Sequence, residues 1–94
     1  MTEIRCKWCE ATLPILADLD RALRDQVVDL VRHGSTAEAF GALARETGLT
    51  LKTAKAVTLH ITRERGTCHR WPCKAKLETG RLDCPVCKGI NFDW

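Results

Sequence analysis

Six cysteines in 94 residues are the feature that most constrains this chain, because they fall into three pairs at short spacing. A chain of this length is one small domain or a helical domain with an appended metal module, and its core is modest. Small domains of this kind often need a metal or disulfides for stability. The pairs are Cys6 with Cys9, Cys68 with Cys73, and Cys84 with Cys87.

The expected redox environment decides between metal ligands and disulfides. The opening "MTEIRCKWCE" has no apolar stretch of signal-peptide length, and nothing elsewhere approaches a membrane span of roughly 20 apolar residues. We therefore expect a cytoplasmic protein with no membrane partner, in which thiols stay reduced. Paired cysteines in such a protein indicate metal binding rather than a disulfide framework.

The third pair, "CPVCKG" at 84–89, is a strong metal signal. Two thiolates two residues apart on a tight turn reach one zinc ion, and a second pair completes a tetrahedral site. Cys68 and Cys73 lie upstream, with a turn-forming loop between them and Cys84. Four residues separate Cys68 from Cys73 where two are usual, as if Trp71 and Pro72 were inserted, and His69 is an alternative ligand to Cys68.

The segment from Cys68 to the end of the chain resembles the zinc ribbon family over about 27 residues. The resemblance implies a short β-hairpin and a zinc site with Cys68, Cys73, Cys84 and Cys87 as ligands. Four thiolates leave no coordination position for water, so the zinc would be structural rather than catalytic. Zinc ribbons occur in transcription, translation and many adaptors, so the family alone does not name a function.

Cys6 and Cys9 have three possible roles. They are less favoured metal ligands, which would replace one pair of the tetrad and join Cys84 and Cys87. They could form a redox-active CxxC and make the chain a thiol oxidoreductase, although that chemistry wants a helix to start at the first cysteine and Pro14 follows closely. The third role is a half-site, left free or shared with another chain.

Three amphipathic helices are expected between the cysteine-bearing segments, with short connections that fold them into a compact bundle. The first follows an N-cap at Asp18 or Asp20, buries Leu19, Leu23, Val27, Leu30 and Val31, and stops at Gly34. The second starts with a capping box of Ser35 and Glu38, buries Ala37, Phe40, Leu43 and Ala44, contains Gly41 as a close-packing position, and stops at Gly48. The third has Thr50 as N-cap, buries Leu51, Ala54, Val57 and Ile61, and runs to about Glu64.

The expected fold class is therefore small α+β, a three-helix unit with a C-terminal zinc ribbon. Its strands would be two short segments around a turn at Thr79 and Gly80, within "KAKLETGRLD". The expected organisation is an N-terminal CxxC arm over 1–17, the three-helix unit over 18–65 and the zinc ribbon over 66–94.

The phrase "TGLTLKTAK" at 47–55 resembles the helical hairpin in the C-terminal domain of the bacterial ribosomal stalk protein. That family reads Thr-Gly-Leu-Gly-Leu-Lys-x-Ala-Lys, and Thr50 stands where the family has its second Gly. The family uses this hairpin to bind translational GTPases through basic residues. The resemblance covers about 36–58 and implies a protein-binding surface that includes Lys52 and Lys55.

The same residues also resemble a DNA-binding helix-turn-helix motif over 36–64. Ala44, Gly48, Leu49, Ala54 and Val57 fit its packing pattern, so the third helix would expose Lys52, Thr53, Lys55 and His60 to a groove. The net charge is only +3, but the segment 52–76 holds seven basic residues against Glu64 alone, which permits an anionic partner. Candidate binding residues are Lys52, Lys55, Arg63, Arg65 and Trp71.

Catalysis finds little support, because the chain has no Gly-rich phosphate loop, HExxH or GxSxG motif. His33 and His60 are expected to be surface or helix-capping residues, and no catalytic residue is predicted. The favoured function is a non-enzymatic zinc-binding module that binds a protein, linked by resemblance to the translation or transcription machinery. Nucleic-acid binding is the main alternative, and the partner and the oligomeric state cannot be read from the sequence.

Overall fold

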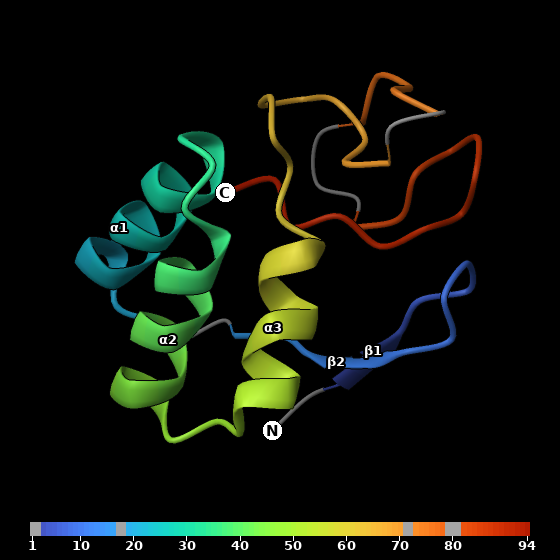
Figure 1. Cartoon of the computed structure of the whole chain (residues 1–94). Helices are drawn as coiled ribbons and strands as arrows, with labels where there is room; N and C mark the ends of the chain where they lie inside the picture. The colour runs from blue at the N-terminus through green and yellow to red at the C-terminus, as the bar shows by residue number, and fades with distance from the viewer. Residues whose placement is uncertain (1–2, 17–18, 71–72, 79–81) are drawn as a thin grey trace.

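The computed structural model describes residues 3–16, 19–70, 73–78 and 82–94. It confirms a small α+β chain with three helices, and it places an antiparallel strand pair at the N-terminus (Figure 1). The strands pair Glu3 with Pro14 and Arg5 with Thr12. The elements are β1 (Glu3–Arg5), β2 (Thr12–Pro14), α1 (Arg21–Arg32), α2 (Thr36–Thr47) and α3 (Leu51–Leu59).

Helix α1 follows its sequence signals closely. The Asp20 side chain accepts the Leu23 N–H at 3.4 Å, and Gly34 adopts a left-handed φ of 85° just beyond the helix. Asp18, the other candidate cap, lies outside the described residues. Val27, Val28 and Val31 are buried against the rest of the molecule.

Helix α2 differs from expectation in two details. Ser35 is the N-cap, but its side chain makes no capping hydrogen bond, so the expected capping box is wrong; the Ser35 carbonyl instead accepts the Ala39 N–H at 3.0 Å. Gly41 is not a close-packing position, because a Cβ built there has no atom within 4 Å. The buried stripe is Ala39, Ala42 and Leu43, and Ala37 is exposed.

Helix α3 ends at Leu59 and not at about Glu64. The next residues leave the helix because they pair with the C-terminal segment. The Thr62 N–H donates to the Phe92 carbonyl at 3.1 Å, and the Phe92 N–H donates to the His60 carbonyl at 2.8 Å. Leu51, at the start of α3, was expected to be buried and is 61% exposed.

The expected C-terminal hairpin is replaced by separate bridges. No regular strand occurs in 66–94 as far as the structure describes it, and the expected turn at Thr79 and Gly80 lies outside the described residues. The antiparallel bridges of this segment instead join Thr67 to Lys76 and Asp83 to Ile90. Each bridge therefore closes a loop that carries one cysteine pair.

One core connects the strand pair, the helices and the C-terminal segment. Leu13 from β2, Leu43 from α2 and Phe92 from the C-terminal segment are all at most 2% exposed and belong to one cluster. Figure 1 shows the C-terminal segment above the strand pair and beside α3, with the C-terminus near the helices. No helix among the described residues is long and apolar enough to cross a membrane.

Candidate metal centres

The three cysteine pairs occupy three turns of the same design. Each turn lies between residues that face each other in antiparallel pairing: Arg5 with Thr12, Thr67 with Lys76, and Asp83 with Ile90. The first cysteine of each pair donates its backbone N–H across the turn, at 2.8 to 2.9 Å. The acceptors are the carbonyls of Ala11 for Cys6, Ala75 for Cys68 and Gly89 for Cys84.

A left-handed residue follows the second cysteine of every pair. Glu10, Lys74 and Lys88 have φ values of 63°, 46° and 63°, and they are the only non-glycine residues with positive φ that the structure describes. In two of the turns this residue lies within a repeated phrase, Cys-x-Ala-x-Leu, which begins at Cys9 and again at Cys73. The two extra residues between Cys68 and Cys73 lengthen the turn without changing its closing hydrogen bond.

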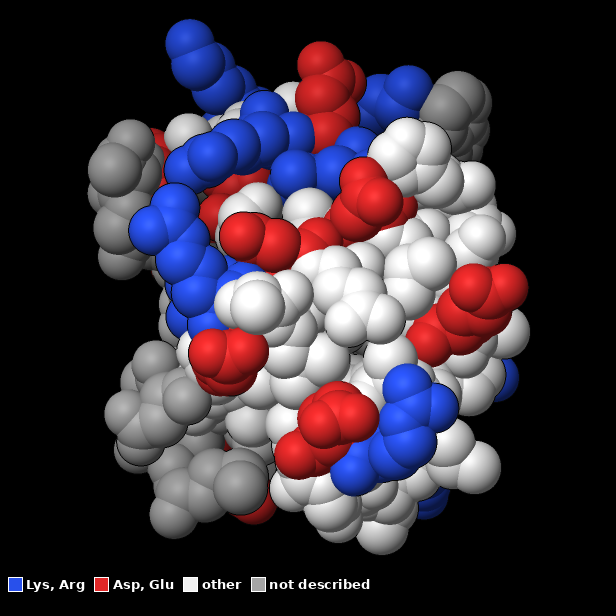
Figure 2. Space-filling view, turned by 90° about the vertical axis from the view of Figure 1, so that its left-hand side faces the viewer, with Lys and Arg blue, Asp and Glu red and all other residues white. Residues whose placement is uncertain are grey.

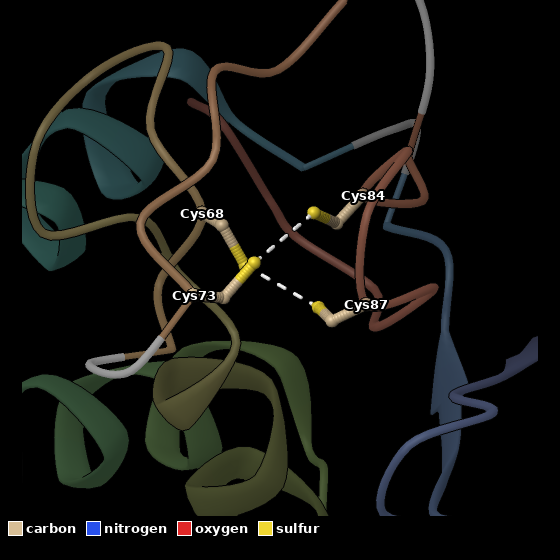
Figure 3. Close-up of side chains that lie close together, drawn as sticks. All are labelled: Cys68, Cys73, Cys84 and Cys87. Carbon is tan, nitrogen blue, oxygen red and sulfur yellow. Dashed lines mark hydrogen bonds between the residues drawn. The ribbon is translucent and has the colours of Figure 1, made fainter.

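The second and third turns bring four thiols together. The Sγ atoms of Cys68, Cys73, Cys84 and Cys87 all lie within 4.8 Å of one another. The Cys68 and Cys87 sulfurs are 3.7 Å apart, as are those of Cys73 and Cys84, and all four cysteines are free thiols (Figure 3). A disulfide would need about 2.05 Å. This arrangement can hold a metal ion.

Polar groups around the four sulfurs are already aimed at them. The Val86 N–H points to Cys84 Sγ and the Gly89 N–H to Cys87 Sγ, both at 3.4 Å. The Asn91 side-chain amide lies 3.6 Å from Cys68 Sγ. Such donors stabilise thiolate, the form that binds metal.

The pKa values of two of these thiols move in opposite directions. Burial raises the pKa of Cys68 to about 12, against the lowering effect of its hydrogen bonds. Burial also opposes ionisation of Cys87, but the Gly89 N–H and the Arg70 side chain outweigh it and lower the pKa of Cys87 to about 7. The hydrogen bonds to Cys87 therefore favour its thiolate, the form that binds metal.

Comparison of the chain with protein family models, curated proteins and solved structures finds no match. The case for a metal site therefore comes from the chain's own geometry.

Asn91 is a site residue that no sequence pattern singled out. Its side chain is 1% exposed and fully engaged. Its Oδ1 accepts from the His69 backbone N–H at 2.7 Å and contacts His69 Nδ1 at 2.6 Å, while its Nδ2 donates to the Gly89 carbonyl at 3.3 Å. Asn91 thus ties the second cysteine turn to the third. No spacing rule would have identified it.

Cys6 and Cys9 do not join the four-cysteine group. Their sulfurs gather with His60 Nε2, all within 4.8 Å of one another. Cys6 is 1% exposed and accepts the Ile90 N–H at 3.4 Å, whereas Cys9 is exposed and lies 3.3 Å from His60 Nε2. The structure therefore places this pair apart from Cys84 and Cys87, which were its less favoured partners in the sequence.

His60 meets only part of the expectation that it lies at the surface or caps a helix. It caps the C-terminus of α3, but its ring is 6% exposed and faces the first cysteine turn. Burial lowers its pKa, only partly offset by the hydrogen bond to the Ala56 carbonyl, so the ring favours the neutral form that ligates metals. His60 is therefore not available to a DNA groove.

The predicted binding residues remain at the surface where the structure describes them. Lys52 and Lys55 are exposed on α3, and Arg63 and Arg65 are exposed in the turn beyond it. Trp71 lies outside the described residues. Figure 2 shows the face over α1 and α2, with Lys and Arg along its upper and left margins and again at the lower right, Asp and Glu across it and a broad uncharged area, so this face is not uniformly basic.

Proposed function

We propose that the four-cysteine group binds one structural zinc ion. The observation that carries the proposal is the pair of 3.7 Å separations between opposite sulfurs. Two thiolates each about 2.3 Å from one zinc at the tetrahedral angle lie about 3.8 Å apart. Soft thiolate ligands in tetrahedral arrangement favour zinc or an iron–sulfur centre, and the site offers space for a single ion.

The proposed zinc stabilises the fold and performs no chemistry. Four protein ligands fill its coordination sphere and leave no position for water or substrate. It would join the turn at 68–73 to the turn at 84–87, which Asn91 also connects through its contacts with His69, Cys68 and Gly89. This is the arrangement expected of a zinc ribbon, and it supports a non-enzymatic protein.

A protein partner is the favoured ligand of the helical unit. On α3 the spacing of Leu51, Lys55 and Leu59 puts their side chains on one line, and both leucines are largely exposed, at 61% and 49%. Trp8, 55% exposed, lines the same hollow as Leu59. Apolar side chains flanked by lysine suit a partner with acidic groups around an apolar patch.

The likeness of 47–55 to the ribosomal stalk hairpin supports the same conclusion. We propose a partner in the translation or transcription machinery that contacts α3. Replacing Leu51 and Leu59 together by Ser should abolish its binding, because the apolar contact area is lost. The matched change is Ala37→Ser, at an exposed position of α2, which should leave binding unchanged in a pull-down followed by titration calorimetry. Equal affinity in both variants would remove α3 from the proposal.

Nucleic-acid binding remains the second candidate because of a basic hollow. A cavity of about 600 Å³ is lined by Arg63, Arg70 and Lys74, together with the acidic Glu64. The test is a gel shift with DNA and RNA across salt concentrations, comparing the wild type with the Arg63→Ala and Arg65→Ala double variant. Binding that weakens with salt and falls in the variant would favour this candidate, and no measurable affinity at low salt would exclude it.

The zinc proposal is tested by native mass spectrometry of the full chain with and without a chelator. The wild type should carry zinc, and Cys73→Ala should lose the ion of the four-cysteine site because three thiolates bind far more weakly than four. The control is Thr12→Ser, a small change at an exposed position, which should keep the wild-type zinc content. An unchanged zinc content in Cys73→Ala would contradict the proposal.

A further inference from the structure

A second cluster of metal-binding atoms lies apart from the four-cysteine group. Cys6 and Cys9 belong to the turn between β1 and β2, and His60 caps α3. The fold brings these distant segments together, with Cys9 Sγ 3.3 Å from His60 Nε2. A thiolate and an imidazole on one tetrahedral zinc lie about 3.5 Å apart, from bond lengths of about 2.3 and 2.05 Å. The observed spacing fits one shared ion.

The imidazole of His60 is oriented for ligation. Its Nδ1 lies 2.6 Å from the Ala56 carbonyl, and a carbonyl oxygen can only accept a hydrogen bond. Nδ1 therefore carries the proton, and the lone pair of Nε2 faces the sulfurs. Metal-binding histidines are typically fixed in this way, by a carbonyl or carboxylate on the nitrogen away from the metal.

The two thiols sit in a turn built like those of the four-cysteine group. The Cys6 N–H closes the turn on the Ala11 carbonyl, and Glu10 takes the left-handed position after Cys9. The Ile90 N–H points at Cys6 Sγ at 3.4 Å. A reactive CxxC would instead expose its first cysteine at a helix N-terminus, whereas Cys6 is buried and lies in a turn between strands.

A hollow adjoins two of the three ligands, Cys9 and His60, and leaves room for a fourth. It has a volume of about 440 Å³ and is lined by Cys9 and His60 together with Trp8, Leu59, His69 and Arg70. The Arg70 guanidinium lies 3.6 Å from the centre of the Trp8 ring, which puts a positive charge at this hollow. A small anion would be favoured there.

We propose that Cys6, Cys9 and His60 bind a second zinc ion through two thiolates and one imidazole, with its fourth position open to this hollow. Water takes that position in the isolated protein, and a small anion can replace it. Three protein ligands with an open position distinguish this site from the closed four-cysteine site. The inference goes beyond the proposed structural zinc and does not depend on it.

The first experiment counts ions by native mass spectrometry of the full chain titrated with Co²⁺. The wild type should bind two ions, and both Cys9→Ala and His60→Ala should bind one. Cys9 is exposed, so its truncation removes little packing and keeps the test valid if His60→Ala unfolds. The control is His33→Ala, which changes an exposed histidine at the C-cap of α1 and should still bind two.

The outcomes separate the two metal proposals. The second site would be overturned if the wild type binds one ion, and if that ion is kept in Cys9→Ala but lost in Cys73→Ala. The four-cysteine site would be overturned instead if the wild type binds one ion that is lost in Cys9→Ala but kept in Cys73→Ala. Two ions that survive in Cys9→Ala would also overturn the second site.

The open position is tested by adding azide to the cobalt-loaded protein. The visible d–d bands of Co²⁺ should shift in the wild type and in Cys73→Ala, and should not respond in Cys9→Ala, where only the closed site remains. Bands that do not shift in the wild type would overturn the open position. Loss of the second ion in His69→Ala would overturn it too, by assigning the fourth ligand to His69.

Discussion

Lys88 adopts a left-handed backbone conformation immediately after the last cysteine, as Glu10 and Lys74 do after theirs. An L-residue with a side chain pays roughly 1 kcal/mol or more for this conformation, and glycine does not. The turn adopts this unfavourable conformation because the resulting geometry directs backbone N–H groups at the sulfurs, as the Gly89 N–H is directed at Cys87 Sγ.

Replacing Lys88 by Gly should therefore raise the free energy of unfolding by about 1 kcal/mol, because the strain of positive φ is removed. The measurement is urea unfolding at saturating zinc. The matched change is Val86→Gly in the same turn, where φ is not positive and the side chain is 70% exposed; this variant should be less stable than the wild type. Equal effects of the two changes would refute the explanation.

Asn91 joins the two cysteine turns through hydrogen bonds from both ends of its side-chain amide. Asn91→Ala leaves the partly buried backbone N–H of His69 without its acceptor and removes the buried donor near Cys68. We expect a loss of about 2 kcal/mol in unfolding free energy, the cost of leaving buried polar groups unpaired. Gln26→Ala, an exposed change on α1, should alter stability by less than about 0.5 kcal/mol. A similar small effect for Asn91→Ala would show that water satisfies these groups.

At the scale of elements, α2 contains two glycines with opposite requirements. Gly41 lies inside the helix with open space around it, while Gly48 ends the helix at a φ of 76°. Gly41→Ala should stabilise the protein by up to about 1 kcal/mol, because alanine has the higher helix propensity. Gly48→Ala should destabilise it by about 1 kcal/mol through strain at positive φ.

Thermal unfolding of the two glycine variants, side by side, checks this pair of predictions. The melting temperature should rise for Gly41→Ala and fall for Gly48→Ala. A fall in both would mean that α2 packs more tightly at Gly41 than the open space around it indicates.

The helices were predictable because their signals are local. Asp20, Thr50 and Gly48 mark helix ends through contacts within a few residues, and all three act as expected. The end of α3 was not predictable, since Thr62 leaves the helix to pair with Phe92, thirty residues away. Helix propensity depends on neighbouring residues and gives no information about pairing with a distant segment.

At the scale of the whole molecule, cysteine spacing predicted which four thiols come together but not the partner of the other two. The count of ligands and the turn-forming residues near Cys84 were sufficient for the first site. The group of Cys6, Cys9 and His60 depends on docking the strand turn against the end of α3. That contact arises from burial of Leu13, Ile61 and Phe92 in one core. No sequence motif indicates that these three residues come together.

Removal of metal should loosen the C-terminal segment before the helices. The amides of Cys68, Leu77 and Cys84 are bonded only within or next to the cysteine turns. In hydrogen exchange after chelation, these amides should lose protection, while those of α1 and α2 exchange more slowly. Simultaneous loss across the whole chain would show that the metal supports the helical core as well.

The most direct test of the four-cysteine site is X-ray absorption spectroscopy of the zinc-loaded Cys9→Ala variant. This variant lacks a ligand of the second cluster, so its zinc reports on Cys68, Cys73, Cys84 and Cys87 alone. The account predicts a shell of four sulfurs at about 2.3 Å with no nitrogen or oxygen. A shell containing nitrogen or oxygen, or a variant that binds no zinc, would contradict it.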